Sequence, residues 1–136
     1  MGISSGDKRM KKGIAEAIFW LHFIIVGVWF LLLFVPLSWW KGRIEFHFFL
    51  SIGIVVHQFV WPVVLLPWTK RYGGICILTT FMQWARGIPL SDERNFRHSW
   101  TKEFFLRFGL RPSPLVITVV PLSILLISAI QYFTLR

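Results

Sequence analysis

Two histidines in long apolar stretches are the residues best suited to chemistry in this 136-residue chain. His22 and His57 stand in segments with the length and composition of membrane-spanning helices. Ionisable side chains are costly inside a bilayer, so they mark candidate functional sites. Facing imidazoles can hold the iron of a b-type haem, and a histidine that titrates near neutral pH can transfer protons or bind a quinone. The sequence favours the simpler interpretation that each histidine is neutral and hydrogen-bonded within the fold.

The single cysteine is the other reactive side chain. Cys76 lies in the run KRYGGICILTTFMQWARG, whose apolar part of about eleven residues is too short to cross a bilayer. A catalytic thiolate needs a base beside it, and no histidine is close to Cys76 in the sequence. The sequence therefore predicts a small buried side chain. No hydrolase elbow, phosphate loop, dinucleotide fingerprint or zinc motif occurs in the chain.

Three apolar runs are long enough to cross about 30 Å of hydrocarbon. They predict an all-α integral membrane protein with transmembrane helices at 14–35, 45–67 and 114–134, and an external loop at 36–44. The hydrophobic fraction of 55% and the mean hydropathy of +0.62 agree with this class. Within the second helix, Pro62 deprives the Gln58 carbonyl of its helical partner and predicts a kink near His57.

The two candidate histidines are predicted to lie at nearly one depth in the membrane. At the standard helical rise, His22 is about 12 Å and His57 about 15 Å from the inner ends of their antiparallel helices. Gly27 and Gly53 lie about one turn further out, where missing side chains would let the two backbones approach. His47 is predicted near the outer interface and His98 in the polar inner segment, both solvated or interfacial rather than ligating.

The basic residues indicate the orientation. Of the 15 Lys and Arg, 12 lie in the tail 1–13 and in the segment 68–113. The positive-inside rule then predicts a multi-pass protein of the bacterial inner (plasma) membrane, with a cytoplasmic N-terminus and an external C-terminus. Because the charges lie in the segments beside the membrane, we expect anionic lipids as partners and no nucleic acid.

The cytoplasmic segment 68–113 is predicted to contain a short buried or re-entrant helix at 75–86 and an amphipathic helix at 95–108. In the amphipathic helix predicted at 95–108, aromatic residues recur at every fourth position and so form a stripe along one face. The basic residues lie on the other faces of this helix. Such a helix lies in the membrane interface, although packing of the stripe on other protein remains open. The stripe consists of Phe96, Trp100, Phe104 and Phe108, and the basic residues are Arg97, Lys102 and Arg107.

Short motifs in the chain resemble those of a family of small bacterial integral membrane proteins known as a domain of unknown function. The matching positions are Leu21, His22, Cys76, Leu78, Thr79, Trp84, Arg86 and Glu103. Departures from the family pattern are Ile77 in place of proline, Met82 of glutamate, Gln83 of asparagine and Phe104 of histidine. The resemblance covers about residues 14–133 and implies a fold but no established activity.

Two functions of different classes follow from the sequence. The first is a non-enzymatic accessory or structural subunit of a larger membrane complex, indicated by the small size and the aromatic-rich surfaces. The second is an electron- or proton-handling protein that binds haem or quinone through His22 and His57. The cofactor, if any, is not identified by the sequence, and haem b is the candidate considered.

Overall fold

The computed structural model describes residues 5–135, except for the side chains of residues 5, 7 and 8, and its regular elements in this range are all helices. Residues 1–4 of the predicted tail, the side chain of Lys8 and the terminal Arg136 lie outside this description. The helices are α1 (Ser5–Leu31), α2 (Arg43–Thr69), α3 (Ile77–Ala85), α4 (Arg94–Arg97), α5 (Trp100–Arg107) and α6 (Pro114–Leu135).

Three of these helices confirm the predicted class of all-α membrane protein. The stretches Arg9–Leu31, Arg43–Thr69 and Pro114–Leu135 are long and apolar enough to cross a membrane. α1 begins inside the predicted tail 1–13 and ends four residues before the predicted 35. α2 continues through Pro67, which had been expected to end it, and finishes where Lys70 adopts a left-handed backbone with φ of 54°. A proline removes only one helical hydrogen bond, which membrane helices tolerate.

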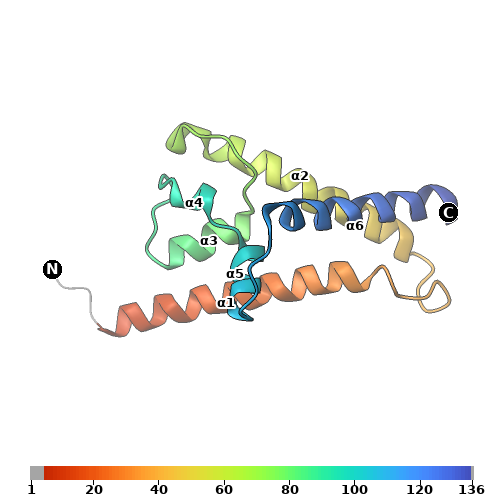
Figure 1. The fold of residues 1–136 in the computed structure, drawn as a ribbon, viewed down its shortest axis with the longest axis horizontal. Coiled ribbons are helices and arrows are strands. Elements are labelled where there is room, and N and C mark those ends of the chain that lie inside the picture. Colours follow the sequence, from red (N-terminus) through yellow and green to blue (C-terminus); the bar gives the residue numbers. More distant parts are fainter. Residues whose placement is uncertain (1–4, 136) are drawn as a thin grey trace.

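The spanning helices form two units rather than a tight bundle (Figure 1). α2 packs along α6, while α3 packs along α1. α1 and α6 run in the same direction and α2 runs against them, so α1 begins and α6 finishes at opposite ends of the molecule (Figure 1). This arrangement agrees with an odd number of crossings. We call the end where α1 begins and α2 finishes the amino-terminal end.

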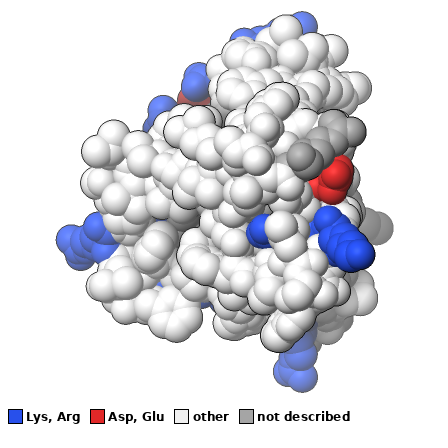
Figure 2. All heavy atoms as spheres, turned by 90° about the vertical axis from the view of Figure 1, so that its right-hand side faces the viewer, with Lys and Arg blue, Asp and Glu red and all other residues white. Residues whose placement is uncertain are grey.

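Polar contacts join α1 to α2 near the opposite end. The indole N–H of Trp29 donates to Ser51 Oγ at 2.8 Å. The buried guanidinium of Arg43 donates to the carbonyl of Leu32, in the turn after α1, at 2.6 Å. These bonds satisfy groups that would be costly to bury without a partner. Seen from this end, the surface is mostly uncharged, with scattered Lys and Arg side chains and few acidic ones (Figure 2).

The predicted close approach at the two glycines is wrong. A Cβ atom added at either Gly27 or Gly53 would meet no other atom within 4 Å. The two helices are instead held together by the larger polar side chains described above. His47 also departs from the prediction, because it is buried, with 1% of its surface exposed, rather than solvated.

The predicted amphipathic helix 95–108 is two helices, not one. The backbone is extended at His98 and Ser99, and the Ser99 hydroxyl accepts from the backbone N–H of Lys102 to cap α5. A serine side chain can hydrogen-bond to nearby backbone groups in place of the helical partners. Serine is therefore favoured at the N-cap of a new helix over the interior of a continuous one. The four aromatic residues therefore do not form one lipid-facing stripe. Trp100 is buried against protein, while Phe108 is exposed.

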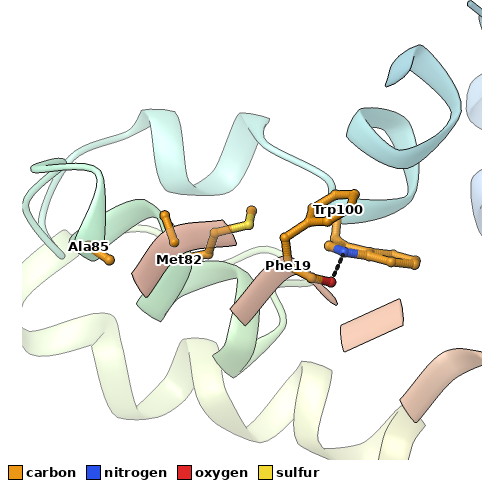
Figure 3. Close-up of a cluster of buried hydrophobic side chains, with 5 residues drawn as sticks. Phe19, Met82, Ala85 and Trp100 are labelled. Carbon is orange, nitrogen blue, oxygen red and sulfur yellow. Dashed lines mark hydrogen bonds between the residues drawn. The ribbon is translucent and has the colours of Figure 1, made fainter. Parts of the chain in front are cut away.

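A small hydrophobic core ties the inserted helices to α1. Phe19 of α1, Met82 and Ala85 of α3, and Trp100 of α5 pack together with Ala15 (Figure 3). The indole N–H of Trp100 donates to the Phe19 carbonyl at 3.1 Å. This tryptophan therefore fixes α5 across α1, next to His22. Fully burying aromatic side chains of this size contributes roughly 1.5–3 kcal/mol each.

Candidate functional site

The segment between α2 and α3 returns into the membrane-spanning part of the protein. Pro62 leaves the Gln58 carbonyl without its helical donor, as predicted, and the backbone N–H of Ile75 donates to that carbonyl at 3.3 Å. Gln58 is about 16 Å along the axis from the end of α2 at Thr69. Residues 70–75 therefore run back beside α2 to this level. The next residue is Cys76.

The return of the chain brings Cys76 between the two candidate histidines. The Cys76 Sγ atom lies 3.4 Å from Nε2 of His57 and 3.9 Å from Nε2 of His22, both within hydrogen-bond range for sulfur. Both imidazoles therefore contact one sulfur atom, as their predicted common depth allows. These partners come from α1 and α2 and not from the local sequence, which has no histidine near Cys76. Cys76, predicted to be buried, is half-buried.

A stacked tryptophan orients the first of these histidines. The His22 ring lies on the Trp100 indole with centroids 4.4 Å apart and planes inclined by 18°. The ring cannot turn freely while this face is covered. The other ring nitrogen, His22 Nδ1, is buried without a hydrogen-bond partner among the described residues. Trp100 is therefore a positioning residue for His22.

The surroundings of Cys76 favour the thiolate. Two imidazoles within hydrogen-bond range stabilise a thiolate more than a thiol, because the thiolate is the stronger acceptor. Cys76 is also the N-cap residue of α3, where the helix dipole stabilises negative charge. The structure thus contains a cysteine–histidine cluster in which one sulfur contacts two imidazoles.

An ion network fixes α5 to α3 and α1 on the amino-terminal side of this cluster. Arg86 of α3 donates two hydrogen bonds to the Glu103 carboxylate, at 2.8 and 2.7 Å. Arg107 donates to Glu103 at 2.8 Å and to Glu16 of α1 at 2.7 and 2.9 Å. His98, predicted to be solvated, lies 3.0 Å from the same Glu103 carboxylate. Burial opposes ionisation of Glu103, yet the two arginines lower its pKa to about 2.

A cavity of about 970 Å³ adjoins the thiol. Cys76, His22 and His57 line it together with residues of α1, α2, α5, α6 and the start of α3. Its volume is at the upper end of the range for ligand pockets. Among the described residues, no group of three or more His, Cys, Asp and Glu side chains is placed to hold a metal ion. The thiol and the two imidazoles are the reactive groups that contact one another beside this cavity.

The structure brings together several residues singled out in the sequence and separates others. Thr79 is buried and lines the cavity, and Arg86 and Glu103 form the ion pair described above. Trp84, by contrast, is exposed and does not line the cavity. Four of the seven proposed membrane-surface residues are exposed, namely Arg97, Lys102, Arg107 and Phe108. Phe96 and Phe104 are half-buried, and Trp100 is buried. Trp61, which the sequence did not single out, donates to Thr80 Oγ1 at 3.1 Å and so holds α3 against α2.

The chain matches no protein-family model, no curated protein and no solved structure. The resemblance to the small membrane protein family therefore stays a prediction from short motifs.

Proposed function

We propose that this chain is a membrane-embedded thiol protein that acts on membrane-soluble molecules through Cys76. The observation that carries this proposal is the pair of contacts, 3.4 and 3.9 Å, between one sulfur and imidazoles from two different spanning helices. A cysteine beside a histidine is the arrangement of a nucleophile and its general base. The adjoining cavity gives the nucleophile space for a ligand.

Selective alkylation of the protein in membranes tests this function, because Cys76 is the only cysteine. Imidazoles beside a cysteine favour its thiolate, which is the form that reacts with a maleimide. We expect a membrane-permeant maleimide to react with the wild-type protein at nearly the same rate at pH 6.5 and 8. His22→Gln and His57→Gln should slow the reaction at pH 6.5 by about tenfold or more.

Two controls isolate the role of the site histidines. Cys76→Ala should abolish labelling, and His47→Gln, which changes a histidine of the same α2 away from the thiol, should leave the rate within about twofold. Arg97 and His98 also line the cavity and are unchanged in all three histidine variants. Any effect of their charge on the alkylation rate is therefore the same in each variant. A wild-type rate that rises tenfold per pH unit up to pH 8.5, unchanged by His57→Gln, would contradict the proposal.

The haem hypothesis is less well supported by this geometry. Axial histidines of a haem lie on opposite faces of an open slot, whereas His22 and His57 both contact the Cys76 sulfur. A visible spectrum of the purified protein separates the two functions. A Soret band that disappears in both His22→Gln and His57→Gln would favour the haem hypothesis over the thiol function.

We also propose that the N-terminus is cytoplasmic in a bacterial inner membrane and that anionic lipids surround the amino-terminal end. The support is the charge count, together with exposed basic side chains such as Arg71 and Arg97 at this end. Reporter fusions at both termini test the orientation, and termini in one compartment would contradict it. Binding to a larger complex as an accessory subunit remains a second hypothesis, which co-purification from membranes tests.

A further inference from the structure

The cavity beside the thiol has a polar part and an apolar part. Arg97, His98, Ser99 and Thr101 line it at the start of α5 and just before it. From His22, the cavity extends along α1 to Phe30, about 12 Å along the helix axis. In that direction its lining from α2 and α6 is aliphatic, as at Ile54, Leu122 and Ile124. The shape and polarity fit an amphiphile whose polar head lies near α5.

Exposed apolar side chains of two spanning helices border the cavity. α1 packs with α3, and α2 packs with α6, whereas α1 and α6 both line the cavity without forming a packed pair. Many side chains of α1 and α6 next to it are exposed apolar residues, such as Phe23 and Leu122. A lipid chain can therefore enter sideways from the membrane. Arg97, which lines the polar part, would favour a lipid with an anionic head.

The number of cysteines limits which thiol reactions this chain can carry out without a second thiol. A redox cycle through a disulfide needs a second thiol, and this chain has one cysteine. Nucleophilic attack on a carbonyl carbon needs one thiolate, a proton donor and stabilisation of the developing oxyanion. The first backbone N–H groups of α3, which have no helical acceptor, begin directly after Cys76. They are placed to receive such an oxyanion together with the helix dipole.

We infer that Cys76 accepts a fatty acyl group from an ester of an anionic membrane lipid, an assignment that rests on the proposed thiol function. The thiolate attacks the ester carbonyl carbon, the C–S bond forms, and the C–O bond to the lipid alcohol breaks. The imidazolium of His57 gives its proton to the departing alkoxide oxygen. The products are a thioester on Cys76 and a lysolipid, so no oxidant or further reactant is needed.

The full chain in vesicles of ester-linked phosphatidylglycerol tests the inference, with the diether analogue as control because it has no carbonyl carbon. We expect intact-mass analysis to show one added fatty acyl group, released by neutral hydroxylamine, together with an equal amount of lysolipid. Neither product should form in diether vesicles or with Cys76→Ala. An absence of acylation in ester vesicles would overturn the inference.

Two glycine variants test whether the acyl chain occupies the cavity. Gly27 lines it, Gly53 does not, and a side chain at either position meets no other atom at the Cβ level. Gly27→Phe should slow acylation by about tenfold or more, while Gly53→Phe should leave it within about twofold. Equal rates in the two variants would overturn the assignment of the chain to this cavity.

Failure of this inference is distinguishable from failure of the proposed function. If Cys76 is alkylated rapidly at pH 6.5 but gains no acyl group from ester vesicles, the acyl assignment fails and the thiol function stands. If alkylation has the pH dependence of an ordinary buried thiol, the proposed function itself fails. A mass gain that occurs only when a quinone is added to diether vesicles would assign the site to a different substrate class and overturn the acyl inference.

Discussion

Replacing Glu103 by glutamine should weaken the attachment of α5 to α3, because glutamine has nearly the same shape as glutamate but no charge. The carboxylate accepts two hydrogen bonds from Arg86 and one from Arg107, all between 2.7 and 2.8 Å. Hydrogen bonds to charged groups contribute about 1.5–3 kcal/mol each when buried, and much less when exposed. These side chains are 17–30% exposed and the amide keeps one acceptor, so we expect a net loss of about 2 kcal/mol.

Hydrogen exchange measured by mass spectrometry reports this loss directly. A loss of about 2 kcal/mol lowers the protection of the α5 amides about 30-fold, while α6 should be unaffected. Glu93→Gln is the matched control, because Glu93 pairs with Arg71 and Arg97 in largely exposed ion pairs. It should change protection by less than about 0.5 kcal/mol. A change below twofold in Glu103→Gln, or an equal change in α6, would refute the reasoning.

The same network predicts a pH dependence whose sign is fixed. The arginines overcome burial and lower the pKa of Glu103 from 4.5 to about 2. Its stabilisation is therefore complete above pH 4.5 and is lost as the pH falls from 4.5 toward 2. Protection of α5, corrected for intrinsic exchange rates, should fall over this range in the wild type. It should fall less in Glu103→Gln, in which only Glu16 and His98 still titrate beside the two arginines.

Three further substitutions test the contacts that position the site. Ser51→Ala leaves the Trp29 indole N–H buried without an acceptor, so thermal unfolding should show a loss of about 1–3 kcal/mol. Arg43→Leu removes the donor to the chain that follows α1 and should lower stability by about 2 kcal/mol in the same assay. Trp100→Phe keeps a ring but loses the bond to the Phe19 carbonyl; it should cost about 1–2 kcal/mol and slow alkylation of the thiol at pH 6.5.

The spans and the kink were predictable because they depend on local properties of the chain. Uninterrupted apolar runs determine the three long helices within a few residues at most ends. Pro62 frees a definite carbonyl, Gln58 O, since a proline has no N–H to donate. The common depth of His22 and His57 follows from the helical rise alone.

The thiol site was not predictable, because it depends on how the chain returns. The donor that completes the Gln58 carbonyl is Ile75, after a turn at Lys70, and only this return places Cys76 between α1 and α2. The residues next to Cys76 in the sequence do not indicate that His22 and His57 contact it. Two signals were available: glycines that permit a sharp entry, and a freed carbonyl that needs a donor.

The break at Ser99 was missed for a different reason. The aromatic spacing over 96–108 fits one continuous helix as well as it fits two short helices. Only tertiary packing decides between one helix and a second helix that begins after the N-cap Ser99. The Trp100 side chain gains more by packing on Phe19 and His22 than by facing lipid, which is already apolar. The extended residues at His98 and Ser99 allow it to reach them.

The most direct test of the account is a titration of the Cys76 thiolate. Its ultraviolet absorbance is measured in the purified protein against Cys76→Ala as the blank. The account predicts a wild-type midpoint at least about one pH unit below the ordinary value of about 8.5, because two imidazoles contact the sulfur. In the double variant His22→Gln, His57→Gln, the midpoint should rise to that ordinary value or above it, because burial then acts without the imidazoles. A wild-type midpoint near the ordinary value of about 8.5, unmoved in the double variant, would contradict it.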